Sequence, residues 1–141
     1  MKIEINHVLI RTTHLKEMSQ FLTQATGLKE GFRPPFNFSG TWLYSHDKPL
    51  VHLVEINSDN NGYSDYLGQQ SSVAEIGLGA VDHIAFTGGN YLQLIERLRQ
   101  QQIEYFERMV PLTGEYQVFA EGPDGLKLEL LFKAAEISSI N

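Results

Sequence analysis

The chain contains no cysteine among its 141 residues. Disulfide bridges, thiolate metal sites and a cysteine nucleophile are therefore excluded. The chain also lacks any apolar run that approaches the length of a membrane span. Its opening residues, MKIEINHV, alternate at once and do not contain the apolar core of a signal peptide. We therefore expect a soluble, cytoplasmic protein with no membrane partner.

Positive charge is also scarce. The chain has 11 Lys and Arg residues against 17 Asp and Glu residues, which gives a formal net charge of −6. A nucleic-acid-binding domain normally presents a basic face, so this balance argues against a nucleic-acid partner. Hydrophobic residues make up 42% of the chain. A chain of this length can bury roughly 70% of its unfolded surface, so we expect an ordinary hydrophobic core.

A short motif occurs twice, as INHVLI at residues 5–10 and as VDHIAF at residues 81–86. Both copies place a polar residue and a histidine next to an apolar run, and both are followed by a helical pattern and then by several strand patterns. The sequence therefore predicts one structural unit that occurs twice. We predict a first module at 1–57, a linker at 58–80, a second module at 81–133 and a loosely held tail at 134–141, the two modules forming one domain.

Local patterns predict the elements of the first module. Residues 3–11 alternate as a strand with Ile3, Ile5, His7, Leu9 and Arg11 on one face. Thr13 is the expected N-cap of a helix that ends at Gly27. The segments TWLYS and LVHLVEI predict two strands joined by the turn HDKP.

The second module has similar signals. Asn90 is the expected N-cap of a helix whose apolar face contains Tyr91, Leu94, Ile95 and Leu98. The segments YQVFAEG and LKLELLF predict a hairpin around the turn sequence PDG.

The repeat places four potential metal ligands in register. His7 and His52 are 45 residues apart, and His83 and Glu129 are 46 residues apart. Similar units commonly pack about a pseudo-twofold axis, where equivalent positions converge. The sequence therefore predicts a metal site of three imidazoles and one carboxylate.

Each of these residues taken alone has a simpler interpretation. Glu129 lies between two leucines of a strand and would be an ordinary exposed charge if its face met solvent. Each histidine shares its strand face with apolar neighbours and could be a core residue. The shared register of all four residues favours the metal site. An unpaired carboxylate in a closed cavity would cost several kcal/mol and would need a cation.

Three stretches carry a family resemblance: NHVLIRTTHL, VDHIAF and GPDGLKLEL. With them the chain resembles the vicinal oxygen chelate superfamily, which contains glyoxalase I, fosfomycin-resistance thiol transferases, bleomycin-resistance proteins, methylmalonyl-CoA epimerases and extradiol dioxygenases. The resemblance covers nearly the whole chain. Gly122 departs from it, since the family more often has aspartate there, and Leu22 replaces a common tyrosine.

The resemblance implies an α+β fold of two βαβββ modules, related by a pseudo-twofold, that form a curled mixed sheet around a divalent metal ion. His7, His83 and Glu129 fall on the three most widespread ligand positions of the family, and His52 falls on the fourth. Arg11 matches an arginine that helps to hold glutathione in glyoxalase I. The resemblance further implies a homodimer that acts on a small molecule.

The ligand set has no sulfur and suits iron(II), manganese, nickel, cobalt or zinc. Such an ion would chelate two neighbouring substrate oxygens, with Glu129 and His52 as the catalytic residues. Glu129 is the expected base, because a metal-bound imidazole has no free lone pair. Pocket walls are expected from Arg33, facing an acidic substrate group, and from Trp42 and Tyr116.

Three functions remain open. Four protein ligands on a six-coordinate ion leave two positions, which suits a glyoxalase-like lyase or isomerase, the preferred hypothesis. Three protein ligands leave three positions, which an extradiol dioxygenase with iron(II) needs for catecholate and oxygen. The third possibility is a small-molecule-binding or fosfomycin-type resistance protein that binds its ligand within the same curled sheet.

Overall fold

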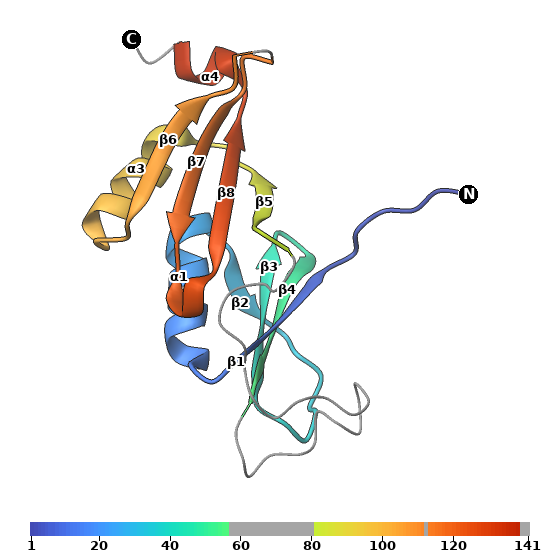
Figure 1. Ribbon diagram of the computed structural model, residues 1–141. Helices are drawn as coiled ribbons and strands as arrows, with labels where there is room; N and C mark the ends of the chain where they lie inside the picture. Colours follow the sequence, from blue (N-terminus) through green and yellow to red (C-terminus); the bar gives the residue numbers. More distant parts are fainter. Residues whose placement is uncertain (57–80, 112, 139–141) are drawn as a thin grey trace. The chain divides into compact units, whose positions relative to one another are not determined.

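The computed structural model describes residues 1–56, 81–111 and 113–138. The chain divides into two compact units, which are residues 1–23 with 27–74 and residues 24–26 with 75–141. Each unit contains one four-stranded mixed sheet (Figure 1). None of the helices in the described part of the chain is long and apolar enough to cross a membrane. The predicted linker lies outside the described residues.

The first unit has the order βαβββ. Its elements are β1 (Val8–Thr12), α1 (Leu15–Thr26), β2 (Lys29–Gly31), β3 (Gly40–Ser45) and β4 (Lys48–Glu55). In the sheet the strand order is β1-β4-β3-β2, with β1 parallel to β4 and the other pairs antiparallel. A parallel pair needs a long crossover, and α1 belongs to the connection that supplies it.

The central strand β4 is apolar on both faces. Val51 and Leu53 are fully buried on one face, while His52 and Val54 are buried on the other. A half-exposed strand would alternate between apolar and polar residues instead. His52 is therefore placed in an interior position by its strand.

Helix α1 ends as its sequence predicts. Gly27 adopts a left-handed conformation with φ 79°, and its N–H donates to the Thr23 carbonyl at 2.9 Å. The predicted N-cap is wrong by one residue. His14 occupies that position, with its N–H donating to the Thr12 hydroxyl oxygen, and the Thr13 hydroxyl contacts the His14 ring instead of the helix.

The first strand is shorter than its alternation predicts. Residues 1–7 have no regular structure and are exposed, and the ladder with β4 begins where Val8 pairs with Val51. Toward its start β4 contains Pro49, which has no N–H to donate to a ladder. His7 therefore lies just outside the sheet, one residue before β1.

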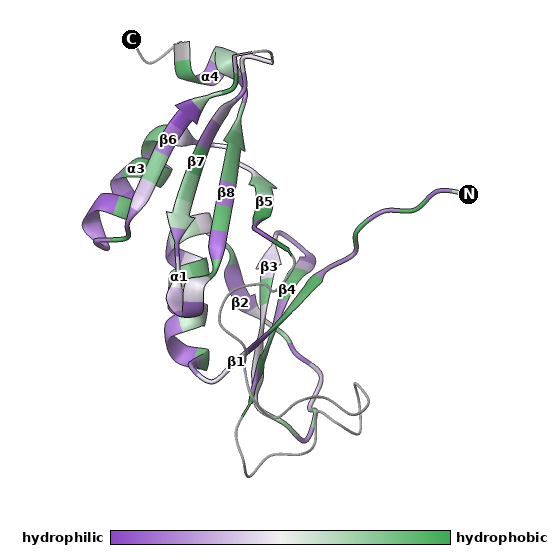
Figure 2. Cartoon of the chain, in the orientation of Figure 1, coloured by the Kyte–Doolittle hydropathy of each residue, from purple (hydrophilic) through white to green (hydrophobic). Residues whose placement is uncertain are grey.

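The second unit repeats the order βαβββ. Its elements are β5 (Ile84–Thr87), α3 (Tyr91–Gln100), β6 (Tyr105–Met109), β7 (Tyr116–Glu121) and β8 (Lys127–Phe132). The strand order is β5-β8-β7-β6, with β5 parallel to β8. The predicted α+β fold of two βαβββ modules is confirmed. Figure 2 shows that β8 is hydrophobic along most of its length, with hydrophilic interruptions.

The turns and caps of the second unit follow the sequence signals closely. The Asn90 side chain accepts a hydrogen bond from the Gln93 N–H at 3.0 Å, and α3 buries Leu94, Ile95 and Leu98. The PDG turn is the short helix η1 (Pro123–Gly125), in which Asp124 has φ 55°. The tail contains a short helix, α4 (Ala134–Ser138), where the sequence analysis expected no element.

Strand register confirms that the two modules are equivalent. In the first sheet His52 lies opposite Leu9 on β1 and Trp42 on β3. In the second sheet Glu129 lies opposite Ala85 on β5 and Phe119 on β7. Leu9 and Ala85 each follow a candidate histidine by two residues. His52 and Glu129 therefore occupy the same place in the two sheets.

Candidate metal centre

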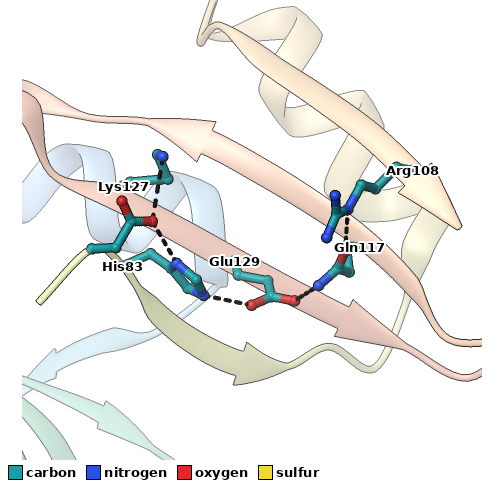
Figure 3. A network of polar contacts seen from close by, with 6 residues as sticks. His83, Arg108, Gln117, Lys127 and Glu129 are labelled. Atoms are coloured by element: carbon teal, nitrogen blue, oxygen red, sulfur yellow. Dashed lines mark hydrogen bonds and ion pairs between the residues drawn. The ribbon is translucent and has the colours of Figure 1, made fainter. Parts of the chain in front are cut away.

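The second unit brings His83 and Glu129 together. The Nε2 atom of His83 lies 2.9 Å from Oε2 of Glu129 (Figure 3). Glu129 is only 5% exposed, because β8 is the second strand of its sheet and is covered on that face. The simpler interpretation of Glu129 as an exposed surface charge is therefore wrong.

The other oxygen of Glu129 is held by a chain of polar side chains. The Gln117 amide donates to Oε1 of Glu129 at 2.5 Å, and Arg108 Nε donates to the Gln117 carbonyl at 2.6 Å. Figure 3 shows these residues as a row across β6, β7 and β8. Gln117 and Arg108 are opposite one another on neighbouring strands. One carboxylate oxygen is thus committed to Gln117, and only Oε2 faces His83.

The second nitrogen of His83 is also engaged. Its Nδ1 lies 2.8 Å from Oδ2 of Asp82, which Lys127 Nζ approaches at 3.4 Å. The hydrogen bond with His83, followed by the charge of Lys127, lowers the pKa of Asp82. An ionised carboxylate only accepts hydrogen bonds, so Nδ1 carries the proton.

This tautomer leaves Nε2 of His83 facing a carboxylate oxygen. Either Nε2 carries a second proton, or its lone pair points at an acceptor and the two repel one another. A metal cation can take the place of that proton, because imidazole nitrogen and carboxylate oxygen are both metal ligands. The pair is therefore suited chemically to share a cation.

The first unit brings His7 and His52 together by stacking. Their ring centroids are 4.0 Å apart, with 14° between the planes. The other face of His52 stacks on Trp42 with a centroid distance of 3.8 Å and an angle of 8°. His52 is 8% exposed. Its ring is thus enclosed between two flat neighbours.

Burial keeps His52 neutral. Desolvation first, and then the charge of His7, lower the pKa of His52 to about 4, while a hydrogen bond with the backbone of Pro49 acts in the opposite direction. Its Nε2 atom is buried with no hydrogen-bond partner. A buried polar atom without a partner is costly. A metal ion would satisfy this atom, so the residues present fit the metal that the sequence analysis predicts.

In His7, as in His83, the Nδ1 atom faces an acceptor oxygen. Its Nδ1 lies 2.7 Å from the side-chain oxygen of Asn6. An amide oxygen is an acceptor, so Nδ1 carries a proton, and in the neutral ring Nε2 has the lone pair. Nε2 is therefore the candidate ligand atom of these histidines: it is buried without a partner in His52 and faces Oε2 of Glu129 in His83.

A pocket of about 360 Å³ lies beside the first pair. This volume falls within the range of small-molecule sites, roughly 300–1,000 Å³. Two predicted wall residues, Arg33 and Trp42, line it. It is also lined by Asn6, His7, Leu9, Phe36, Phe38, Pro49, His52 and Val54.

The structure does not bring the remaining predicted residues to these groups. Tyr116 lies on the opposite face of β7 from Gln117 and Phe119, where its ring meets Tyr91 of α3 edge to face. Tyr116 is not among the residues that line the pocket of the first unit, and its role as a pocket wall stays a prediction. Arg11 shares a face of the first sheet with His52 but does not line the pocket.

Sequence reasoning missed Asn6, Asp82, Gln117 and Arg108. Asn6 and Asp82 were visible, since each precedes the histidine of the repeated motif. Gln117 and Arg108 carried no local signal, because their contacts depend on strand register.

The four candidate ligands occur as two pairs, one in each unit. No group of three or more His, Cys, Asp and Glu side chains that could hold an ion exists among the residues the structure describes.

No family model matches the chain, and no curated protein matches its sequence. Solved structures match it over nearly its whole length. A glyoxylase/bleomycin resistance protein/dioxygenase domain from Frankia sp. EAN1pec is 15% identical, with a TM-score of 0.66 over 94% of this chain and 99% of that one. A putative glyoxalase family protein from Bacillus anthracis is 16% identical, with a TM-score of 0.67 over 94% and 97%.

A genomically encoded fosfomycin resistance protein from Listeria monocytogenes is also similar. It is 16% identical, with a TM-score of 0.61 over 94% of each chain. The chain therefore has the fold of the glyoxalase, bleomycin resistance protein and dioxygenase group.

Proposed function

We propose that this protein is a metal-dependent enzyme for a small molecule, a glyoxalase-like lyase or isomerase. Its proposed ligands are His7, His52, His83 and Glu129, which bind one divalent ion. The proposal concerns the chemistry of these side chains and applies equally if the pairs come from one chain or from two chains of a homodimer. The homodimer stays a prediction from the resemblance, and the mass of the protein in solution tests it.

One observation carries the proposal: the Nδ1 of His7 and of His83 each contacts an acceptor oxygen, and the buried Nε2 of His52 has no hydrogen-bond partner. Asn6 engages His7 and Asp82 engages His83, while His52 has an unpartnered Nε2 and a hydrogen bond to the backbone of Pro49. Core histidines that serve only packing would satisfy both nitrogens. The unpartnered Nε2 of His52 and the Nε2 of His83 that faces the Glu129 carboxylate support a ligand role for these residues.

The proposed chemistry divides between the ion and the chain. When bound, a divalent ion of the iron, manganese, nickel, cobalt or zinc group would polarise neighbouring oxygens of the substrate. Glu129 is the proposed proton acceptor, through Oε2, since Gln117 holds Oε1. His52 is neutral and therefore fit to be a ligand, and it is a weak base because its pKa is about 4.

A second candidate, an extradiol dioxygenase with iron(II), is favoured by the stacking of His7 on His52. The planes of the two rings differ by only 14°, so their lone pairs lie in nearly parallel planes. Such lone pairs do not converge on one ion unless a ring turns. If His52 stays in its stack, the ligands are two histidines and one carboxylate, the set of non-haem iron oxygenases.

Metal analysis tests the proposal. Protein purified without chelators should contain one equivalent of a divalent metal. The alanine variants of His7, His83 and Glu129 should each lose it while remaining folded. His14→Ala and His46→Asn are matched controls, because both histidines are exposed and outside the candidate set. Full metal occupancy in all three ligand variants would contradict the assignment.

The variant His52→Gln separates the two chemistries. The lyase or isomerase hypothesis expects this variant to lose metal, and expects the wild type to consume no oxygen with catechols. Retained metal, together with oxygen uptake by the iron(II) form given a catechol, would favour the dioxygenase. A protein that binds no metal but sequesters a small ligand would instead support the resistance-protein alternative.

A further inference from the structure

The pocket of the first unit contains a cation that the metal proposal does not use. Arg33 lies between β2 and β3, in a segment without regular structure, and it lines the pocket together with Trp42 and His52. The remaining walls are mostly apolar or aromatic. A positive charge in such a cavity is uncommon unless something pairs with it.

The position of the guanidinium is fixed by its neighbours. Its Nη2 donates to the Phe38 carbonyl at 2.8 Å, and its Cζ lies 4.9 Å from the ring centroid of Phe38 and 5.1 Å from that of Phe36. Gly40 leaves the space that it occupies, because a Cβ there would lie 2.8 Å from Nη2. The arginine is therefore preorganised before any ligand arrives.

One donor of this side chain has no partner. Nε of Arg33 is buried and unsatisfied, and burial lowers the pKa of the side chain. Within residues 1–56, 81–111 and 113–138, no carboxylate forms an ion pair with Arg33. The interactions that hold it are one carbonyl and two aromatic rings. They leave the guanidinium without an anion, although its N–H groups form strong, charge-assisted hydrogen bonds with carboxylates.

We propose that Arg33 pairs with the carboxylate of a small substrate whose planar apolar part lies against Trp42 and Phe36. The reaction of this substrate rests on the proposed metal site, because the candidate ligands His7 and His52 line the same pocket. It adds the substrate class: a small organic acid with a flat, apolar body. Arg33 is thus a specificity-determining residue.

The charge of the whole chain makes such a preference informative. With a formal net charge of −6, the protein repels anions at long range. A preference for an anion over a neutral molecule of the same shape therefore has to come from a local cation.

Trp42 provides a direct readout, since it is the single tryptophan of the chain and lines the pocket. Benzoate and benzamide are suitable probes, because they share a ring and differ mainly in charge. Each is titrated into chelator-treated protein while tryptophan fluorescence is followed. We expect the wild type to bind benzoate roughly tenfold or more tightly than benzamide, as a charge-assisted pair should give.

The substitution Arg33→Gln should abolish this preference, and Arg33→Lys should weaken benzoate binding while leaving benzamide unchanged, because lysine lacks the planar fork. Lys29→Gln is the matched control. It removes one positive charge from exposed β2 and should keep the wild-type preference. Circular dichroism and thermal melting establish that each variant is folded.

Equal affinity of the wild type for the two probes, or binding of neither, would overturn the proposal. So would an intact preference in folded Arg33→Gln. If that variant fails to fold, unchanged benzoate affinity in Arg33→Lys overturns the proposal in its place. Because the assay contains no metal, a negative result in it does not contradict the metal site. A negative metal analysis likewise does not contradict the preference for benzoate.

Discussion

At the scale of single residues, the side chain before each motif histidine decides which ring nitrogen carries a proton. Asn6 and Asp82 both accept from Nδ1 of the next residue, although one is neutral and the other charged. What they share is a short side chain with an acceptor oxygen. Such outer contacts fix the tautomer and orientation of metal-binding histidines. This gives a physical reason for the repeated pair of Asn-His and Asp-His.

Removing either acceptor should weaken metal binding. For Asn6→Ala and Asp82→Ala we expect a loss of about 10- to 100-fold in metal affinity, measured by competition with a chromogenic chelator. Asp82→Asn keeps an acceptor oxygen and should lose less. The matched control is Thr13→Ala, which removes a contact from Oγ1 to Nδ1 of His14, a histidine outside the candidate set. Wild-type affinity in both alanine variants would refute the orienting role.

At the scale of elements, β4 and β8 have the same position in their sheets. Each pairs with a parallel strand on one side and an antiparallel strand on the other, so each is covered along both edges. A side chain at the middle of such a strand is held firmly by its neighbours. His52 and Glu129 occupy these middle positions, so two residues of different chemistry are held in equivalent places.

Signals contained within one element were predictable. The Asn90 cap, the Gly27 helix end and the PDG turn depend on a few adjacent residues, and each is present as predicted. Strand parity also placed Glu129 on the face opposite Leu128 and Leu130.

Features that depend on pairing could not be predicted. Alternation extended the predicted first strand back to Ile3, whereas the ladder with β4 begins at Val8. Gln117 on β7 reaches Glu129 on the neighbouring strand β8, twelve residues along the chain, and only the register reveals this contact. The same register places Tyr116 on the other face of β7, which its sequence position alone did not indicate.

The cap of α3 gives a test of stability at this scale. Asn90→Ala removes the acceptor for the Gln93 N–H and should lower the free energy of unfolding by about 1 kcal/mol. Urea denaturation followed by circular dichroism measures the change. Gln93→Ala is the control, because it keeps the backbone donor and alters only an exposed side chain. A loss in the control equal to that in Asn90→Ala would show that the cap is not responsible.

At the scale of the whole molecule, the βαβββ module occurs twice, and the candidate functional residues differ between the two copies. The first module carries two histidines, Trp42 and the Arg33 pocket, while the second carries a histidine, a carboxylate and the Gln117 chain. The residue opposite the ligand of the central strand is aromatic in both, Trp42 in one and Phe119 in the other. The two copies therefore share one architecture, while the candidate pocket lies in the first and the proposed proton acceptor, Glu129, in the second.

The buried neutral state of His52 links this chemistry to the stability of the whole chain. In metal-free protein the pKa of His52 is about 4, whereas an unfolded chain has the ordinary value of about 6.5. Between about pH 4 and about pH 6.5, His52 binds a proton in the unfolded state but not in the folded state. His52 therefore contributes nothing to the pH dependence above pH 6.5, and its effect destabilises the fold progressively as pH falls from about 6.5 to about 4. One proton accounts for a slope of at most about 1.4 kcal/mol per pH unit.

The substitution His52→Gln should remove this part of the slope, because glutamine does not titrate. Urea unfolding of chelator-treated wild type and variant between pH 7 and pH 4.5 measures it, and the two stability curves should converge toward acid pH. His46→Asn serves as the control, since His46 is an exposed turn residue with φ 55° where asparagine is tolerated, and it should retain the wild-type slope. Parallel curves for wild type and His52→Gln would mean that the His52 ring takes up its proton at the same pH in the folded and the unfolded protein, and would contradict the burial that keeps it neutral.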